Sequence, residues 1–125
     1  MLGKLAILAL GGALGTLSRY GVSLLAGRVA GGTFPLGTLV VNLTGCFLIG
    51  LAYALAEDRA VLGPAGRLFF MTGFLGALTT FSTFALETVS YGQAGTPAIS
   101  ALNLVVNNIG GLLLVLLGMW VGRIV

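Results

Sequence analysis

Four long apolar stretches, at about residues 5–25, 36–56, 68–91 and 98–121, constrain this chain more than any other feature. A helix needs about 20 mostly apolar residues to cross a bilayer, and each stretch meets that requirement. Only 7% of the residues are charged, against about 25% in soluble domains. The sequence therefore predicts an all-α integral membrane protein, in which residues 1–125 form a single four-helix transmembrane domain.

Basic residues near the ends of the spans bear on orientation. An even number of spans puts both termini on one side of the membrane. The basic residues expected on that side are Lys4, Arg59, Arg67 and Arg123. Arg28 lies on the other side, joined by Arg19 if that side chain reaches the interface. The excess favours termini inside the cell, but it is small enough to leave insertion in both orientations open.

Composition excludes several classes of function. The chain has no histidine and only three acidic residues, so it lacks the means for a usual zinc or carboxylate metal site. The same shortage rules out a catalytic set of nucleophile, base and orienting group, and we expect no enzyme. The six basic residues are scattered singly, which suits the flanks of membrane spans rather than nucleic-acid binding.

Asparagines inside the spans are candidate functional residues, because polar side chains are costly in lipid. Asn42 lies in the second stretch, and Asn103, Asn107 and Asn108 lie in the fourth. Asn103 and Asn107 are four apart, so they share a helix face with Cβ atoms about 5–6 Å apart. Each amide offers two N–H donors. Hydrogen bonding between helices would explain any one of them. Asn42, Asn103 and Asn107 together, beside a cluster of hydroxyls, favour a polar pathway.

The segment "GALTTFSTFAL", residues 76–86, gathers hydroxyls and aromatic rings inside the third stretch. Its hydroxyl residues are Thr79, Thr80, Ser82 and Thr83. Phe81 and Phe84 are three apart, so their rings lie along one helix face. An aromatic ring has a positive edge that can meet an anion, although plain packing also explains a pair at this spacing.

The same segment predicts a break in the third helix. Gly73 and Gly76 precede Thr79 and Thr80, and threonine side chains compete for backbone hydrogen-bonding groups. Broken helices are tolerated in membranes where they line a cavity or are buried in protein. Carbonyls freed at such breaks serve as cation ligands in transporters. We therefore expect an interruption here, with Phe81 and Phe84 just beyond it.

The charges available inside the spans favour an anion. A proton-coupled pump needs an acid at depth, and the one candidate is Glu87, near the end of the third stretch. A cation channel uses carboxylate or carbonyl rings. The amides, the hydroxyls and Arg19 are donors instead. Arg19 either extends to the interface beside Tyr20 or biases an entry vestibule toward anions.

Three motifs in order, "GGALGTLSRY", "GTLVVNLTG" and "GFLGALTTFSTFALE", together with "ALNLVVNNIGG", make the whole chain resemble the Fluc (CrcB) fluoride channels. The resemblance implies an antiparallel, dual-topology homodimer in the bacterial plasma membrane. It also implies passive export of fluoride through two pores, which lowers fluoride toxicity. The partners implied are fluoride, membrane lipid and a second copy of the chain, with no nucleic acid.

The resemblance also assigns roles to residues. The implied fluoride pathway comprises Asn42, Phe81, Phe84, Ser82, Thr83, Asn103 and Asn107. Arg19 matches an arginine near the vestibule. The backbone carbonyls of Gly76 and Thr79 match those that hold a structural sodium ion at the dimer interface. Three positions depart from the family pattern, namely Ala77, Ala85 and Gly111, and they affect mainly the outer end of the track.

Two other functions compete with a fluoride channel. A small multidrug-type exporter also has four spans, but it should carry a proton-coupling carboxylate in its first span, and residues 5–25 contain none. A structural subunit without a pore would rest on glycine packing alone. Gly11 with Gly15, and Gly118 with Gly122, have the spacing that lets membrane helices approach closely.

Overall fold

The computed structural model describes residues 1–125 and is entirely helical, with four helices long and apolar enough to cross a membrane. The first two are α1 (Leu2–Ala30) and α2 (Leu36–Glu57). The third, Pro64–Gln93, comprises α3 (Pro64–Arg67), the π-helical segment η1 (Leu68–Leu75), α4 (Gly76–Leu78) and α5 (Phe81–Gln93). The fourth, Pro97–Ile124, comprises α6 (Pro97–Val105), the π-helical segment η2 (Val106–Gly110) and α7 (Gly111–Ile124).

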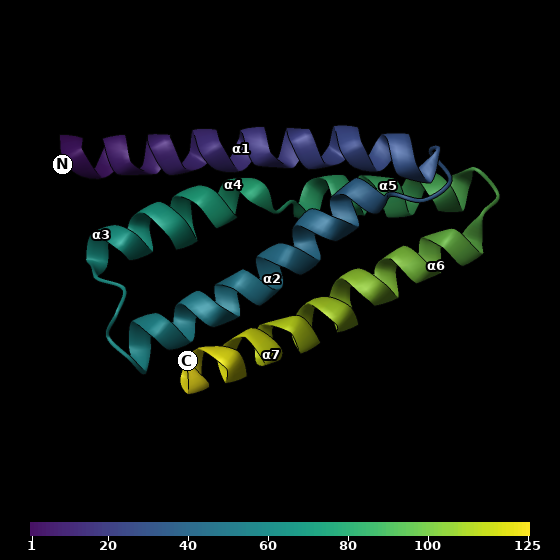
Figure 1. Cartoon of the computed structure of the whole chain (residues 1–125). Coiled ribbons are helices and arrows are strands. Elements are labelled where there is room, and N and C mark those ends of the chain that lie inside the picture. The colour runs from purple at the N-terminus through teal and green to yellow at the C-terminus, as the bar shows by residue number, and fades with distance from the viewer.

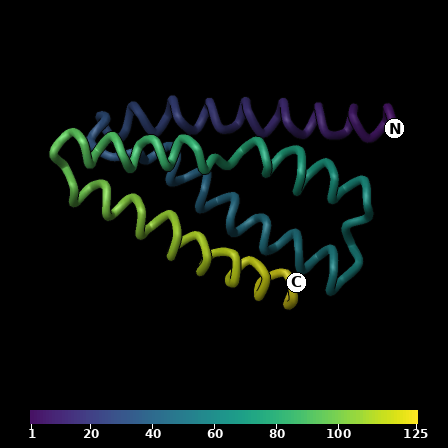
Figure 2. The backbone as a smooth tube through the Cα atoms, turned by 180° about the vertical axis from the view of Figure 1, so that it is seen from behind, coloured from purple at the N-terminus to yellow at the C-terminus, as the bar shows by residue number.

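The second helix runs obliquely between the other three (Figure 1). On one side of it α1 lies along the third helix, and on the other side lies the fourth helix. The view from behind shows both termini toward the same end of the bundle (Figure 2), as an even number of spans requires. All four helices extend past the apolar stretches of the sequence.

Proline and glycine punctuate the helices. Pro64 and Pro97 stand at the first turn of the third and fourth helices, where the missing N–H has no helical acceptor anyway. Pro35 directly precedes α2. The first helix ends at Gly31, whose φ of 56° is left-handed, a conformation that glycine adopts without a Cβ clash.

Both glycine pairs lie at close helix contacts, which confirms their packing role. A Cβ atom on Gly11 or Gly15 would overlap the backbone of η1. A Cβ on Gly118 would overlap the Phe47 carbonyl of α2, and one on Gly122 would lie 2.7 Å from the Ala54 side chain. Small residues of this kind let backbones approach in lipid, where the hydrophobic effect does not drive helices together.

The predicted break in the third helix falls at Thr79 and Thr80. Thr79 has φ −83° and ψ 158°, and Thr80 has φ −151° and ψ 118°, so both are extended. Thr80 then serves as the N-cap of α5, because its side chain accepts a hydrogen bond from the Thr83 N–H. The cap therefore lets α5 begin directly after the break.

Charged residues close the end of the bundle that holds the termini. Arg67 forms an ion pair with Glu57 and also donates to the Ala56 carbonyl, with Nη2 to O 2.6 Å. Arg123 Nε lies 2.8 Å from Asp58 Oδ2. These contacts tie the C-terminal end of α2 to the third helix, and the α2–α3 loop to the C-terminal end of the fourth.

Candidate functional site at the helix break

Asn42 of α2 holds the break in place through its side-chain amide. Its Oδ1 accepts from the Thr80 N–H at 2.8 Å, and its Nδ2 donates to the Thr80 carbonyl at 3.1 Å. In a continuous helix the Thr80 N–H would bond to the Gly76 carbonyl. The asparagine therefore replaces a helical bond that the break removes, satisfying both peptide groups of Thr80.

The same amide begins a line of polar side chains toward the other end of the bundle. Asn42 Nδ2 donates to Asn107 Oδ1 at 2.9 Å, and Asn107 Nδ2 donates to Asn103 Oδ1 at 2.9 Å. Asn103 is fully buried and donates to Thr88 Oγ1 at 2.9 Å. We define these three asparagines and Thr88 as the amide line. Asn42, Asn103 and Asn107 were each predicted from the sequence, and the structure brings them together.

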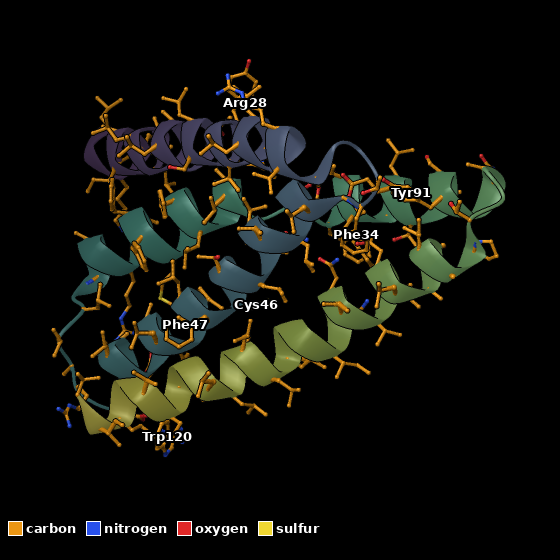
Figure 3. The ribbon with its side chains drawn as sticks, turned by 45° about the vertical axis from the view of Figure 1, so that its right-hand side comes forward. Arg28, Phe34, Cys46, Phe47, Tyr91 and Trp120 are labelled. Carbon is orange, nitrogen blue, oxygen red and sulfur yellow. The ribbon has the colours of Figure 1, made fainter.

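A cavity of about 350 Å³ lies beside the start of the amide line. Its polar wall consists of Asn42, Thr79, Thr80, Asn107 and Asn108, and its remaining lining is Gly45, Cys46, Ile49, Met71, Leu75, Gly76, Phe81 and Phe84. No carboxylate is among them. Cys46 projects from the middle of α2 (Figure 3). The cavity thus offers amides, hydroxyls and aromatic rings, and no negative charge to repel an anion.

Phe81 and Phe84 both line this cavity but differ in environment. Their ring centroids are 5.6 Å apart, and the rings are tilted by 57°. Phe84 is 5% exposed, whereas Phe81 is 77% exposed. The Phe84 ring therefore packs in the protein, while the Phe81 ring stands at the open side of the cavity.

Ser82 and Thr83 lie apart from the amide line, although the resemblance joins them to one track. Both are exposed. Thr80 Oγ1 lies 3.0 Å from Thr83 Oγ1 and 3.5 Å from Ser82 Oγ. Their hydroxyls thus cluster around Thr80, the N-cap of α5.

Arg19 of α1 contacts the break at Thr79, which lines the cavity together with Gly76. The Arg19 guanidinium donates to the Thr79 carbonyl across 3.5 Å and is half-buried. Arg19 thus turns toward the break instead of extending to the membrane interface. The Thr79 hydroxyl donates to the Leu75 carbonyl at 3.0 Å, so its side chain is engaged within its own helix while its carbonyl faces Arg19.

Glu87 lies one turn beyond Phe84 and lines a second cavity, of about 250 Å³. Thr38 Oγ1 donates to Glu87 Oε1 at 2.7 Å, while Oε2 is buried without a hydrogen-bond partner. Phe34 and Tyr91 line the same cavity and lie near each other at this end of the bundle (Figure 3). The acid is therefore outside the cavity at the break.

Sequence reasoning missed Thr38 and Thr88 as parts of this polar system. Thr38 precedes Asn42 by four residues, and Thr88 follows Phe84 by four, so each lies one turn from a predicted residue on the same helix face. Thr88 also donates to the Phe84 carbonyl at 2.8 Å. That spacing was the available signal.

These features define a four-span membrane protein with a broken third helix and a donor-rich cavity at the break. Residues 6–119 match the family model described as CrcB-like protein, Camphor Resistance (CrcB). The chain belongs to this CrcB family and is a multi-pass protein of the bacterial plasma membrane.

Its relatives are named as fluoride-specific ion channels. One from Nitrosococcus oceani is 46% identical over 122 residues, covering 98% of each chain. One from Acidobacterium capsulatum is 49% identical over 121 residues, covering 92% of each. One from Shewanella amazonensis is 47% identical over 111 residues, covering 89% of each. The similarity therefore includes all four spans.

Proposed function

We propose that this protein is a fluoride-selective channel that lets fluoride leave the cell passively and so lowers its toxicity. The observation that carries the proposal is the cavity at the break, lined by Asn42, Asn107 and the two phenylalanines with no carboxylate. Fluoride is small and strongly hydrated, so it needs hydrogen-bond donors close by when it sheds water. The names of the relatives support the same ion.

Selectivity follows from what each group can offer. Amide N–H and hydroxyl groups donate short hydrogen bonds, which suit the small fluoride ion better than the larger chloride. The ring edges of Phe81 and Phe84 carry partial positive charge and contact an anion without a strong donor that would trap it. Passage through the site then needs binding that is favourable but weak enough for release.

The direct test is anion efflux from liposomes that contain only this protein. Liposomes loaded with fluoride should empty rapidly, while those loaded with chloride should empty no faster than protein-free liposomes. Equal rates for the two ions would refute selectivity. A proton-driven exporter would instead require an imposed pH gradient, so flux in its absence separates the two mechanisms.

We further propose an antiparallel homodimer in which the chain inserts in both orientations. Phe81, Ser82 and Thr83 are exposed in the middle of a spanning helix, and hydroxyls facing lipid are unfavourable. A second copy, or the pore it encloses, would cover them. Reporter fusions at the C-terminus should give signals from both sides of the membrane; a signal from the cytoplasmic side alone would contradict the proposal.

The carbonyls of Gly76 and Thr79 fit a structural sodium ion at the centre of that dimer. Thr80 donates to Asn42 and not to Gly76, which leaves the Gly76 carbonyl without its helical donor. The Thr79 carbonyl keeps a second lone pair beside the Arg19 contact. A two-fold axis would bring four carbonyls together, and the lack of nearby carboxylates favours a monovalent ion. The ion would supply positive charge near the pores.

The sodium proposal is tested by a high-resolution map of the dimer and by flux after stringent sodium removal. We expect density coordinated by the four carbonyls, and tolerance of Thr79→Val, because the Thr79 side chain bonds to Leu75 and not to the ion. Density held only by water, or carbonyls that point away from the axis, would overturn this site.

A further inference from the structure

Asn108 is a membrane-depth asparagine that the pathway described above leaves unused. It lies in η2, near the middle of the 28-residue fourth helix, and it is exposed. Its side chain lines the 350 Å³ cavity together with Asn42, Asn107 and Phe81. A primary amide directed at hydrocarbon would be costly, so its place on a polar cavity calls for a ligand.

The hydrogen bonds of the three cavity amides set Asn108 apart. Asn42 Nδ2 donates twice, to the Thr80 carbonyl and to Asn107 Oδ1. Asn107 Nδ2 also donates twice, to the carbonyl and to Oδ1 of Asn103. Asn108 Nδ2 donates once, to the Leu104 carbonyl at 2.7 Å. Because an amide has two N–H groups, Asn108 retains one donor without an acceptor in the protein.

The π-helical geometry of η2 explains how two consecutive asparagines reach one cavity. In η2 the turn holds more residues than an α-helical turn, so neighbouring side chains are rotated less from each other. The Gly111 N–H at its end reaches the carbonyls of both Asn107 and Asn108. The bond to Leu104 then pins the Asn108 amide, leaving its second N–H fixed in direction.

We propose that Asn108 forms an anion subsite at the open side of the cavity, donating its second amide N–H to a dehydrating fluoride ion. This rests on the proposed fluoride channel and adds a donor to it. An incoming anion meets this N–H without breaking a bond of the amide line, whereas Asn42 and Asn107 must first release an oxygen acceptor. Asn108 thus acts at capture, ahead of those residues.

The test compares Asn108→Leu with wild type in the liposome assay over a range of fluoride concentrations. Leucine keeps the approximate size but removes the donor. Loss of one hydrogen bond to an anion should lower fluoride efflux at subsaturating concentration by about tenfold or more, raise the half-saturating concentration by a similar factor, and reduce the preference for fluoride over chloride. Asn108→Ser, which keeps a hydroxyl donor, should fall between. Ile109→Ala, exposed on the same turn but absent from the cavity wall, is the matched control.

Each outcome separates this inference from the proposed function. Absence of fluoride efflux in wild type refutes the channel itself. Normal efflux, half-saturation and selectivity in Asn108→Leu leave the channel standing and refute the subsite, making Asn108 a lipid-facing or interface residue. If Asn108→Leu does not yield folded protein, Asn108→Ala, which also removes the donor, decides by the same half-saturation measurement, with an unchanged value refuting the subsite.

Discussion

The contact between α2 and α7 and the contact between α2 and the helix break are built on opposite principles. The first is dry: Gly50 and Gly118 bring backbones so close that a Cβ on either would overlap a carbonyl of the other helix. The second is polar, with Asn42 making three hydrogen bonds to Thr80 and Asn107. One helix thus serves as scaffold along part of its length and as part of the site along another.

The difference teaches where tolerance to substitution should lie. Close packing fails when any atom is added, because neither backbone can move without losing the whole contact. A polar contact fails when a donor or acceptor is removed, because the remaining group stays unsatisfied in a low-dielectric setting. Volume therefore governs the first contact and hydrogen-bond chemistry governs the second.

The largest expected effect is that of Gly118→Val. A Cβ there would overlap the Phe47 carbonyl and lie 2.9 Å from the Leu51 N atom. We expect the free energy of unfolding to fall by about 3 kcal/mol or more, with loss of most monodisperse protein on size-exclusion chromatography. Gly12→Val is the control, since a Cβ at Gly12 meets nothing within 4 Å. Equal yields for the two variants would contradict the packing account.

Asn42→Leu should have the next largest effect and should lower both stability and fluoride efflux. The Thr80 N–H would lose its acceptor, which costs about 1–3 kcal/mol of stability, and fluoride efflux should fall by more than about tenfold. Thr44→Val, at an exposed position of the same helix, is the matched control and should leave both unchanged. Normal efflux in Asn42→Leu would remove the amide line from the pathway.

The two phenylalanines sharpen the comparison, because one is packed and the other exposed. Phe81→Ile and Phe84→Ile should both abolish or greatly slow fluoride efflux, since each removes a positive ring edge. Only Phe84→Ile should lower stability, by about 1 kcal/mol, as it changes a buried shape. Phe70→Ile is the control: Phe70 does not line the cavity, so this variant should keep normal fluoride efflux. Near-normal flux in both cavity variants would return the rings to plain packing.

Arg123→Gln should have the smallest effect. Its partner Asp58 and its own side chain are exposed, and such ion pairs contribute about 1 kcal/mol or less. We expect a stability change within that limit, reduced further at high salt, and unchanged fluoride efflux. A loss of more than about 2 kcal/mol would mean that the contact between Arg123 and Asp58 is needed to hold this end of the bundle together.

Much of this architecture could be predicted because lipid makes its requirements visible in sequence. Apolar length indicated four spans, and Gly76 followed by Thr79 and Thr80 indicated the break. Asn103 and Asn107 share a face because of their spacing alone. Each inference used only local periodicity or a residue type that is costly in a membrane.

What could not be predicted depends on which helices become neighbours. Thr38 pairs with Glu87 across 49 positions of sequence, and Arg19 reaches Thr79 across 60. Neither pair has a local signature. The π-helical turn at Asn107 and Asn108 could not be predicted either. Its residues also occur in ordinary α-helices, and the extra residue in the turn is visible only in the backbone. Tertiary contacts, not propensity, decided all three.

The pairing of Asn42 with Thr80 has a consequence for how the break behaves. One side-chain amide exchanges two hydrogen bonds with the N–H and C=O of a single extended residue, as opposed residues do in an antiparallel β-ladder. The Asn42 side-chain amide therefore takes the place that the backbone of one residue would have in a partner strand. We expect these two hydrogen bonds to limit opening of the break, so the Thr80 amide proton should exchange with solvent more slowly than an amide proton without a partner.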